Sequence, residues 1–586
     1  MRSANWMFAA VGLLLVGVGG RLTWLAESQR ASRSEQANRQ HTARAHIKAL
    51  RGSILDCNGR TLAGSQRRPS LIVDPSRVTD VRAACRRIET VLGVDADWLE
   101  RRITERRGRR YFRVKRRLSD RERARFERAS VMRELGAFFL EDEPLRVHPL
   151  GRSAAHVVGY VGADQRGLAG VELTCDELLT GKDGSRTAIV DSRRRRLEPV
   201  PDAALPAVDG CDVVLTIDAY LQSRAQFHLA QAVETHNAEW GTALLMDPDS
   251  GEILAMAVTP DFDPDAPIRP DAEGRELDAE FERIRNHAIA DQFEPGSIFK
   301  PFVAGPAVSD EQASLDEQFE INGPTHAFGT RIVHDTHPHA VLELASILSK
   351  SSNIGMAMLG EKLGAERVHD YVARFEFGRR TGIRLPGEHS GALHALRDWT
   401  RYSVQSVPFG QEVAVTPIQV LRAFLAFCND GLLYQPRIVR AVLRADGSVR
   451  KDYSQPVVVR RVMRAEAVRD LRRRALVEVV NSGTGTRAQL ADYQVFGKTG
   501  TAQIARRDGR GYEPGAYVGS FMGGAPADNP RLAVLVSLYH PRGGKYYGGT
   551  VSAPAAREIL ADGLAYLHVP RDLARSASVS GTAQAD

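Results

Sequence analysis

The longest uninterrupted apolar run lies at the N-terminus. Residues 3–20 carry no charged side chain, and Trp6 and Trp24 bracket the run. A helix of this length rises about 27 Å, close to the thickness of a bilayer's hydrocarbon core, and tryptophan favours both membrane interfaces. The run is long for a cleaved signal peptide, and no small-x-small cleavage site follows it. The pattern therefore predicts a retained single-span membrane anchor over residues 1–28.

The hydrophobic pattern of the C-terminal two thirds mixes short strands with amphipathic helices. A buried strand is predicted at 213–218 and a helix at 220–234, and a turn Asp-Pro-Asp-Ser-Gly joins two further strands at 242–246 and 252–258. Another helix begins at Thr416-Pro417. The last predicted elements are three antiparallel strands and a closing helix, at 493–501, 516–525, 531–539 and 553–567. This mixture predicts an α+β domain.

The N-terminal third is less regular. A polar, Ala/Gln/Arg-rich segment from Glu27 to Leu50 predicts a helical stalk, and Asn58-Gly59 predicts a hairpin turn. The segment 191–196 predicts an exposed loop, and the Pro/Ala-rich segment 199–207 predicts a linker. The predicted domains are an anchor, a stalk, a first globular domain, a second globular domain and a disordered tail, at 1–28, 29–49, 50–207, 208–570 and 571–586.

Composition fits a multidomain globular protein and excludes several classes. The chain has 586 residues, of which 43% are hydrophobic and 26% charged, and its formal net charge is +7. No zinc-finger spacing, RNA-binding aromatic motif or P-loop accompanies the positive charge, so nucleic acid is not an expected partner. Five scattered cysteines argue against a disulfide framework and against a thiolate zinc site.

A serine and a lysine three residues apart mark the first candidate site. Ser297 and Lys300 follow Pro295-Gly296 at the start of an apolar helix, and this spacing places them on one helical face. A serine can act as a nucleophile if a nearby base takes its proton. A lysine can be that base only when burial or a positive neighbour keeps it neutral. The chain has 79 Lys and Arg but only nine Lys, and arginine cannot be deprotonated in a protein.

Two further motifs follow Ser297 and Lys300 in a set order. Ser351-Ser352-Asn353 follows an amphipathic run, and Lys498-Thr499-Gly500-Thr501 follows a short apolar strand. The order S-x-x-K, S-x-N, K-T-G is typical of penicillin-binding enzymes and serine β-lactamases. Ser-x-x-Lys alone occurs by chance in most long chains, whereas the ordered trio rarely does.

Two other polar segments have a structural and a functional interpretation. His334, Asp335, His337 and His339 are donor types that suit zinc, but Pro338 splits the cluster and no cysteine lies near. A loop leading into the Ser351 helix is the preferred interpretation, and we expect no metal and no cofactor. The Arg-rich segment 101–117 is either a solvated face or a contact with an anionic cell-wall polymer or lipid headgroup.

With these motifs the chain resembles the class B penicillin-binding proteins, which are membrane-anchored peptidoglycan D,D-transpeptidases. The resemblance runs from about residue 1 to 565. The ending Val551-Ser552-Ala553-Pro554 is more similar to the division-specific branch than to the elongation branch. Cys57 and His287 depart from the family pattern. Further matching segments are Arg51-Gly52-Ser53-Ile54-Leu55-Asp56, Ala155-His156-Val157-Val158-Gly159-Tyr160, Gly170-Val171-Glu172, Arg285-Asn286, Gly410-Gln411 and Tyr546-Tyr547-Gly548-Gly549.

The resemblance implies a fold and a location. It implies a mostly β pedestal domain, followed by a transpeptidase domain with a five-stranded antiparallel sheet and helices on both sides. It also implies a single-pass protein of the inner membrane with its catalytic domain on the periplasmic side. The basic residues Arg30, Arg33, Arg39 and Arg44 after the span disfavour this orientation by the positive-inside rule, so the orientation rests on the resemblance alone.

The resemblance also implies a role for each motif residue. Ser297 would attack the penultimate D-Ala of a stem peptide, with Lys300 as its base. Ser351 would relay a proton to the leaving amine, and Asn353 would orient Lys300 and the substrate amide. The substrate carboxylate would be held by the last motif, whose residues are Lys498, Thr499, Gly500 and Thr501.

The family resemblance also implies partners, and it leaves alternative functions open. The partners would be peptidoglycan stem peptides on lipid-linked precursor strands, β-lactams, and a membrane glycan polymerase of the division machinery. The alternatives are an elongation-specific transpeptidase, or a non-catalytic penicillin-binding sensor or scaffold. A β-lactamase is disfavoured because no convincing Glu-x-x-x-Asn segment supplies a deacylating base. A second, glycan-polymerising active site is disfavoured because the N-terminal third shows no acidic motif for it.

Overall fold

The computed structural model describes five stretches of the chain, residues 2–130, 135–190, 196–266, 281–506 and 511–572. Its contacts divide the chain into two compact units that interleave along the sequence. We call them the N-terminal unit and the C-terminal unit. Residues 1–51, 67–144 and 180–210 make up the first, and residues 52–66, 145–179 and 211–586 make up the second.

The C-terminal unit is built on a five-stranded antiparallel sheet, and this confirms the fold class that the family resemblance implies. The strands lie in the order β10-β9-β21-β20-β19, so strands from the two ends of the unit pair at the centre. β19 carries the Lys498 motif and is an edge strand of this sheet. The strand bounds are Trp240–Met246 for β9, Ile253–Thr259 for β10, Phe496–Ala505 for β19, Tyr512–Ala525 for β20 and Leu532–Tyr539 for β21.

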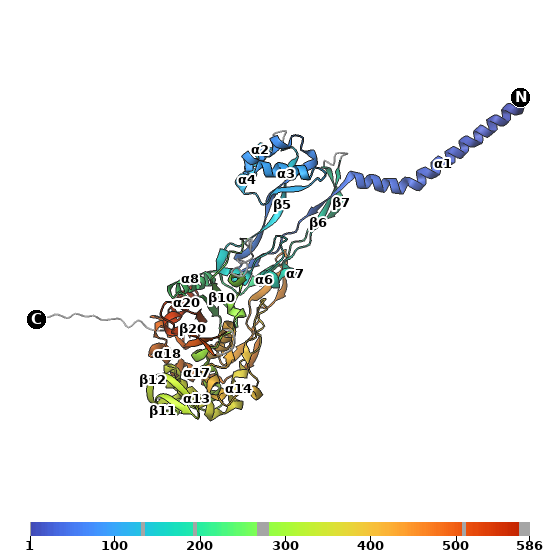
Figure 1. Cartoon of the computed structure of the whole chain (residues 1–586). Coiled ribbons are helices and arrows are strands. Elements are labelled where there is room, and N and C mark those ends of the chain that lie inside the picture. The colour runs from blue at the N-terminus through green and yellow to red at the C-terminus, as the bar shows by residue number, and fades with distance from the viewer. Residues whose placement is uncertain (1, 131–134, 191–195, 267–280, 507–510, 573–586) are drawn as a thin grey trace. The chain divides into compact units, whose positions relative to one another are not determined.

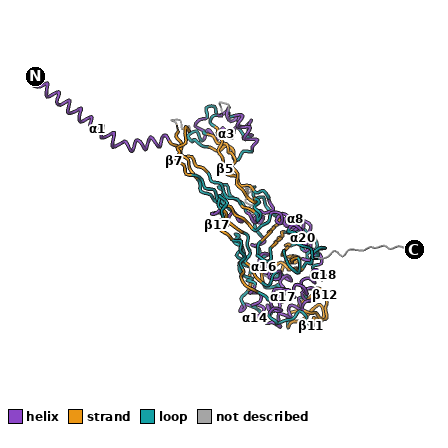
Figure 2. The backbone as a smooth tube through the Cα atoms, turned by 180° about the vertical axis from the view of Figure 1, so that it is seen from behind, coloured by secondary structure: helices purple, strands orange, loops and turns teal. Residues whose placement is uncertain are grey.

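Helices cover both faces of this sheet because its strands are apolar on both sides. α8 (Ala219–Thr235) and α20 (Ala553–Tyr566) pack on one face, and α16 (Pro417–Cys428) packs on the other (Figures 1 and 2). Successive residues of a strand point to opposite faces. Leu244 of β9 accordingly belongs to the cluster that includes α16, and Leu245 belongs to the cluster that includes α8 and α20.

The segment between β10 and β19 supplies most of the remaining helices. α11 (Pro301–Ser309) follows a 3-10 turn at Gly296–Phe299. The helical segment from Ala465 to Asn481 contains a π-helical turn at Arg472–Leu476. The other helices and strands of this segment are α10 (His287–Ala290), β11 (Gln318–Phe328), β12 (Arg331–Glu343), α12 (Leu344–Lys350), α13 (Asn353–Leu363), α14 (Ala365–Arg374), β13 (Ala392–Leu393), α15 (Ser403–Ser406), β14 (Val413–Ala414), β15 (Leu432–Tyr434), β16 (Val439–Leu443), β17 (Val449–Asp452), β18 (Val458–Arg461), α17 (Ala465–Leu471) and α18 (Val477–Asn481).

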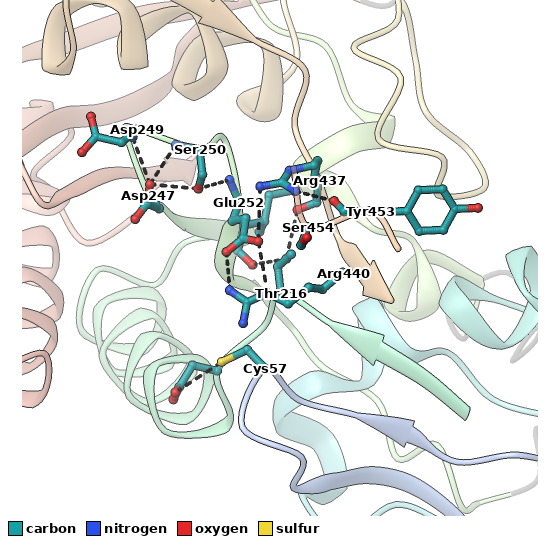
Figure 3. Close-up of polar contacts among 12 residues, drawn as sticks. Cys57, Thr216, Asp247, Asp249, Ser250, Glu252, Arg437, Arg440, Tyr453 and Ser454 are labelled. Carbon is teal, nitrogen blue, oxygen red and sulfur yellow. Dashed lines mark hydrogen bonds and ion pairs between the residues drawn. The ribbon is translucent and has the colours of Figure 1, made fainter. Parts of the chain in front are cut away.

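A buried ion cluster joins β10 to β16 within this unit (Figure 3). The Glu252 carboxylate accepts hydrogen bonds from Arg437 Nη2 at 3.3 Å and from Arg440 Nη2 at 2.6 Å. Thr216 Oγ1 donates to the backbone carbonyls of Ile253 and Arg437. Removing one partner of a buried ion pair leaves an uncompensated charge, so this cluster fixes β16 against the start of β10.

The N-terminal unit combines strands with three short helices. α2 (Val81–Leu92), α3 (Ala96–Glu105) and α4 (Asp120–Ala129) form its helical part. Ile88, Leu99 and Phe126 lie in one hydrophobic cluster with residues of β3. α2 begins at an Asp80 cap, and α4 begins with a Ser119–Glu122 capping box. The strands are β1 (Thr42–Ile47), β3 (Thr61–Val73), β4 (Phe112–Lys115), β5 (Phe138–Val147), β6 (Gly184–Val190) and β7 (Arg196–Leu205).

Helix α1 (Arg2–His41) contains the apolar N-terminal run. Within the described part of the chain it is the one helix long and apolar enough to cross a membrane, over Trp6–Leu25. The prediction of a helical stalk over 27–50 is wrong in its second half. The helix ends at His41, and the residues that follow form β1, which pairs with β6 because Thr42 to Ile47 can supply a full ladder of backbone donors and acceptors.

The Pro/Ala-rich linker predicted at 199–207 is also wrong for most of its length, because β7 extends to Leu205. β7 lies at the edge of the sheet β1-β6-β7. Proline cannot donate to a ladder, but an edge strand has one side that needs no donor. The loop predicted at 191–196 and the tail predicted after 571 fall almost wholly outside the described residues.

Candidate active site

The nucleophile candidate Ser297 lies in a tight turn between two buried segments. The 3-10 turn Gly296–Phe299 leads into α11, and Lys300 is the residue that joins the two. Gly296 has a φ of +55°, and its N–H donates to the carbonyl of Gly410 at 3.0 Å. Ile298 and Phe299 are fully buried, whereas Ser297 is partly exposed. The turn thus anchors its neighbours in the core and leaves Ser297 partly exposed.

Strand β19 runs alongside this turn. A Cβ added at Gly500 would lie 3.1 Å from the backbone nitrogen of Ile298 and 3.2 Å from the carbonyl oxygen of Pro295. A Cβ added at Gly296 would lie 3.2 Å from the carbonyl oxygen of Thr501. Gly500 therefore has a geometric reason to be glycine, since any side chain would push the edge strand away from the nucleophile turn.

Four predicted site residues meet in one hydrogen-bond cluster. Lys300 Nζ donates to Ser351 Oγ at 3.1 Å, to the Ser351 carbonyl at 2.6 Å and to Asn353 Oδ1 at 2.9 Å. Lys498 Nζ donates to the same Ser351 Oγ at 2.9 Å. Three motifs that lie about 50 and 145 residues apart in sequence thus share one hydroxyl. Ser297 Oγ makes no hydrogen bond to any described residue.

Both lysines are completely buried, and both have lowered pKa values. Burial, followed by the positive charge of Lys498, holds the pKa of Lys300 well below the ordinary lysine value, and Asp335 opposes the shift. Burial lowers the pKa of Lys498 to about 7. Because burial disfavours the charged form of an amine, the buried site shifts Lys300 toward the neutral form that a general base requires.

The Ser-x-Asn motif forms the junction of α12 and α13. Ser351 ends α12 in the left-handed conformation, with φ +63°, which is uncommon for a residue with a side chain. Ser352 caps α13 by accepting from Gly355 N–H. Asn353 begins α13, and its side-chain amide donates to the His334 carbonyl. The strained φ turns the Ser351 hydroxyl toward both lysines.

Asp335 has a structural role that the sequence did not reveal. Its carboxylate accepts from the backbone N–H groups of Asn353 at 2.5 Å and Ile354 at 3.1 Å, and from Ser352 Oγ at 2.5 Å. It thereby binds the N-terminus of α13, where an anion is stabilised. In the part of the chain that is described, no group of three or more His, Cys, Asp and Glu side chains could hold a metal ion. The segment 334–339 lies in strand β12 and not in a loop.

The remaining motif residues line the same edge of β19. Thr499 Oγ1 shares a hydrogen bond with Thr484 Oγ1 at 2.5 Å, and Thr501 Oγ1 accepts from Gly548 N–H at 3.2 Å. Hydroxyls on both sides of Gly500 are therefore positioned at the edge where Ser297 is exposed. An anionic group of a ligand placed there would meet Lys498 and two hydroxyls.

Two supporting residues were not selected from the sequence. Glu294 precedes the nucleophile turn, and its carboxylate accepts from Tyr512 OH at 2.7 Å and from Glu412 N–H at 2.9 Å. Gly410 has a φ of +84°, and a Cβ there would lie 2.2 Å from the Gly296 carbonyl oxygen. The Gly410-Gln411 pair was noticed only as part of the family resemblance, because its contact is with a residue more than a hundred positions away.

The chain matches two family models. Residues 241–561 match the model described as penicillin binding protein transpeptidase domain. Residues 46–215 match the model described as penicillin-binding protein dimerisation domain.

Similar proteins extend this likeness over nearly the whole chain. A probable peptidoglycan D,D-transpeptidase PenA from Neisseria meningitidis is 30% identical over 570 residues, which cover 96% of this chain and 93% of the relative. Peptidoglycan D,D-transpeptidase FtsI from Escherichia coli is 29% identical over 579 residues, which cover 97% and 93%. A crystal structure of penicillin binding protein 3 from Mycobacterium tuberculosis, complexed with aztreonam, is similar with a TM-score of 0.68 and 27% identity, covering 90% and 98%.

Proposed function

The chain belongs to the penicillin-binding protein transpeptidase family, in its class B, and we propose that it crosslinks peptidoglycan stem peptides through an acyl-enzyme on Ser297. The observation that carries the proposal is the cluster in which Lys300 and Lys498 both donate to Ser351 Oγ. Relatives that cover almost the full chain carry the name peptidoglycan D,D-transpeptidase, which supports the same activity here.

In the proposed first half-reaction, Ser297 Oγ attacks the carbonyl carbon of the penultimate D-Ala. The neutral Nζ of Lys300 takes the hydroxyl proton, and the carbonyl electron pair moves onto the oxygen. The backbone N–H groups of Ser297 and Thr501 stabilise this oxyanion, a device worth roughly 3 to 4 kcal/mol per donor. The C–N bond then breaks, the terminal D-Ala leaves, and Ser351 Oγ delivers the proton to its amine.

In the second half-reaction, the amine of a neighbouring stem peptide attacks the ester carbonyl. A proton leaves the amine through the same Ser351–Lys300 relay, and Ser297 recovers its proton as the ester bond breaks. Asn353 holds Lys300 in place and contacts the substrate amide. Lys498, Thr499 and Thr501 bind the substrate's terminal carboxylate, with Gly500 allowing the close approach of β19. A β-lactam reacts by the first step alone and stays on Ser297.

The cellular role that we propose is synthesis of the division septum. It is supported by the resemblance of the Val551 to Pro554 segment to the division branch and by the likeness to FtsI. Relatives with other names, PenA and stage V sporulation protein D, are about equally similar, so sequence identity alone does not establish the division role. With α1 as a single-span anchor in the inner membrane, we place the catalytic unit on the periplasmic side, where it meets lipid-linked precursor strands and a membrane glycan polymerase.

Fluorescent penicillin tests the chemistry and the location together. The native chain should form a covalent, denaturation-resistant adduct, and Ser297→Ala should form none while keeping the melting temperature of the native protein. Fluorescence imaging of the tagged native chain should place it at mid-cell. Labelling of Ser297→Ala at the native level would show that Ser297 is not the nucleophile. Placement of the tagged chain along the lateral wall would favour the elongation role.

A further inference from the structure

The positive charge of the chain is concentrated in one part of the N-terminal unit. Residues 67–144 hold 21 Arg and Lys against 14 Asp and Glu, an excess of seven. The formal net charge of the whole chain is also +7, so the other residues balance one another. A charge excess confined to one segment indicates a surface for an anionic partner and not a general adaptation for solubility.

Within this segment the acidic residues neutralise only some of the arginines. Glu143 pairs with Arg113 and Arg116, and Glu127 pairs with Arg123. Other arginines are exposed or half-buried and make no side-chain hydrogen bond or ion pair with any described residue. They are Arg82, Arg86 and Arg87 on α2, Arg101 on α3, Arg107, Arg109 and Arg110 in the turn after it, and Arg121 and Arg125 on α4.

Helix α2 presents three of these arginines around one shallow hollow. Arg82, Arg86 and Arg87 line a depression of about 510 Å³ together with Asp80 and Thr90. The Asp80 carboxylate accepts from Ala83 N–H and forms no ion pair with these arginines among the described residues. Arg82 and Arg86 are four residues apart, a spacing at which like charges destabilise a helix. Arg87 Nε is buried without a partner.

We propose that this face of α2 binds the phosphate headgroups of an anionic phospholipid bilayer. Guanidinium groups match phosphate oxygens in a bidentate geometry and are more weakly hydrated than ammonium groups. Anionic headgroups attract basic segments that lie within a Debye length of the membrane surface. Bound phosphate would relieve the repulsion between Arg82 and Arg86 that the free protein leaves uncompensated.

Two features favour a lipid surface over a soluble anionic polymer. The N-terminal unit also contains α1, whose candidate span keeps the chain at a bilayer, so the inference rests on the anchoring proposed above. Outside α1, the described part of the unit exposes two large aromatic side chains, Tyr111 at 47% and Phe139 at 43%. Aromatic residues with exposed arginine neighbours suit the membrane interface.

The test uses the full chain in proteoliposomes that contain a photoreactive phosphatidylglycerol headgroup. Irradiation is followed by mass-spectrometric mapping of the crosslinked peptides. The double variant Arg82→Glu, Arg86→Glu removes the proposed contact. The matched control is Arg102→Glu, Arg123→Glu, which makes the same charge change in the same unit at arginines that already pair with Glu105 and Glu127. Retained penicillin labelling and an unchanged melting temperature show that each variant folds.

Crosslinks should map to residues 81–92, and their yield should fall as ionic strength rises. Each arginine near an anionic surface is worth about fivefold in binding, so the α2 variant should lose crosslinking by roughly tenfold or more while the control stays near the native yield. Equal losses in the two variants, salt-independent yields, or crosslinks elsewhere would overturn the proposal. So would protection of α2 by soluble anionic glycan strands without any lipid crosslink. Failure of the chain to remain with the vesicles would instead refute the anchor.

Discussion

Lys300 and Lys498 are two fully buried lysines that converge on the single hydroxyl of Ser351. Two ammonium groups this close would repel each other in a buried site. Burial and the charge of Lys498 hold the pKa of Lys300 well below its ordinary value, which favours its neutral form. Burying these two amines therefore lowers the free energy of unfolding.

The free energy of unfolding should depend on pH because the pKa of Lys498 is lowered in the folded state. Burial lowers the folded-state pKa of Lys498 to about 7, whereas an unfolded lysine titrates near pH 10.4. Between these values the unfolded chain binds more protons, so the free energy of unfolding should rise with pH, by at most about 1.4 kcal/mol per unit from this group. Below pH 7 the group contributes no slope.

Lys498→Met should remove this contribution, so its melting temperature should rise less than that of the native protein between pH 7 and pH 9. Lys451→Met, on the exposed strand β17, is the control and should keep the native slope. Parallel melting curves for Lys498→Met and the native chain would show that Lys498 is not a buried amine with a lowered pKa.

Single residues also mark the limit of what the sequence could predict. The trio at 297, 351 and 498 was recognisable because its members are close in sequence within each motif. Asp335 was not, because its partners are backbone N–H groups of α13 that only the fold brings to it. Read locally, its carboxylate beside His334 indicated a weak metal candidate.

The nucleophile turn is the element on which the site depends, and a distant glycine supports it. The Gly296 N–H donates to the Gly410 carbonyl, and Gly410 itself has a φ of +84°. Since any Cβ at Gly410 would lie 2.2 Å from the Gly296 carbonyl oxygen, the turn and the loop cannot both keep their positions once a side chain is added.

Gly410→Ala should therefore slow penicillin acylation and destabilise the protein by more than backbone strain alone. Gly447→Ala is the matched control, because Gly447 has a φ of +83° and no atom within 4 Å of its added Cβ. The control should cost roughly 1 to 2 kcal/mol, the penalty for a left-handed non-glycine residue, and leave acylation unchanged. Equal acylation rates in the two variants would show that Gly410 does not position Ser297.

Elements with strong periodicity were predicted well. The strands and helices around the catalytic motifs follow alternating or helical patterns, and α16 and α20 begin within a residue of their predicted starts. The predictions of a helical stalk and of a linker were wrong because both segments form strands whose pairing partner is remote in the sequence. β1 and β7 both pair with β6. The alternation of β1 is short and rests on two alanines and Ile47, and Pro199 and Pro201 interrupt the pattern of β7. The fold's edge positions tolerate polar and proline residues that local rules assign to coil.

At the scale of the whole molecule, the chain order and the compact units do not coincide. Residues 52–66 and 145–179 belong with the C-terminal unit although the basic segment and its helices lie between them. Sequence reading predicts domains as continuous stretches, so it could not foresee this interleaving. The Arg-rich segment 101–117 is visible in the sequence, and the structure places it in the N-terminal unit with the rest of the basic segment 67–144.

The apolar span of α1 should hold the full chain in the membrane. Trp6–Leu25 is long and apolar enough to cross a bilayer, and helices of about 20 apolar residues remain in membranes when surface charges are screened. The chain should therefore stay with the membrane fraction after washes in high salt and in alkaline carbonate. A charged pair, Leu13→Arg with Leu15→Arg, should weaken this retention. Release of the native chain by either wash would contradict an integral anchor.

The central claim is that the neutral amine of Lys300 activates Ser297, and the acylation rate of Lys300→Met tests it most directly. The second-order rate constant for a fluorescent penicillin should be measured across pH for the native chain and the variant. A general base contributes about 10²- to 10⁴-fold, so the variant should be slower by at least a hundredfold. The native rate should fall as pH drops and Lys300 becomes protonated, and the variant should lack that dependence. A variant that acylates at the native rate with the native pH profile would contradict the account.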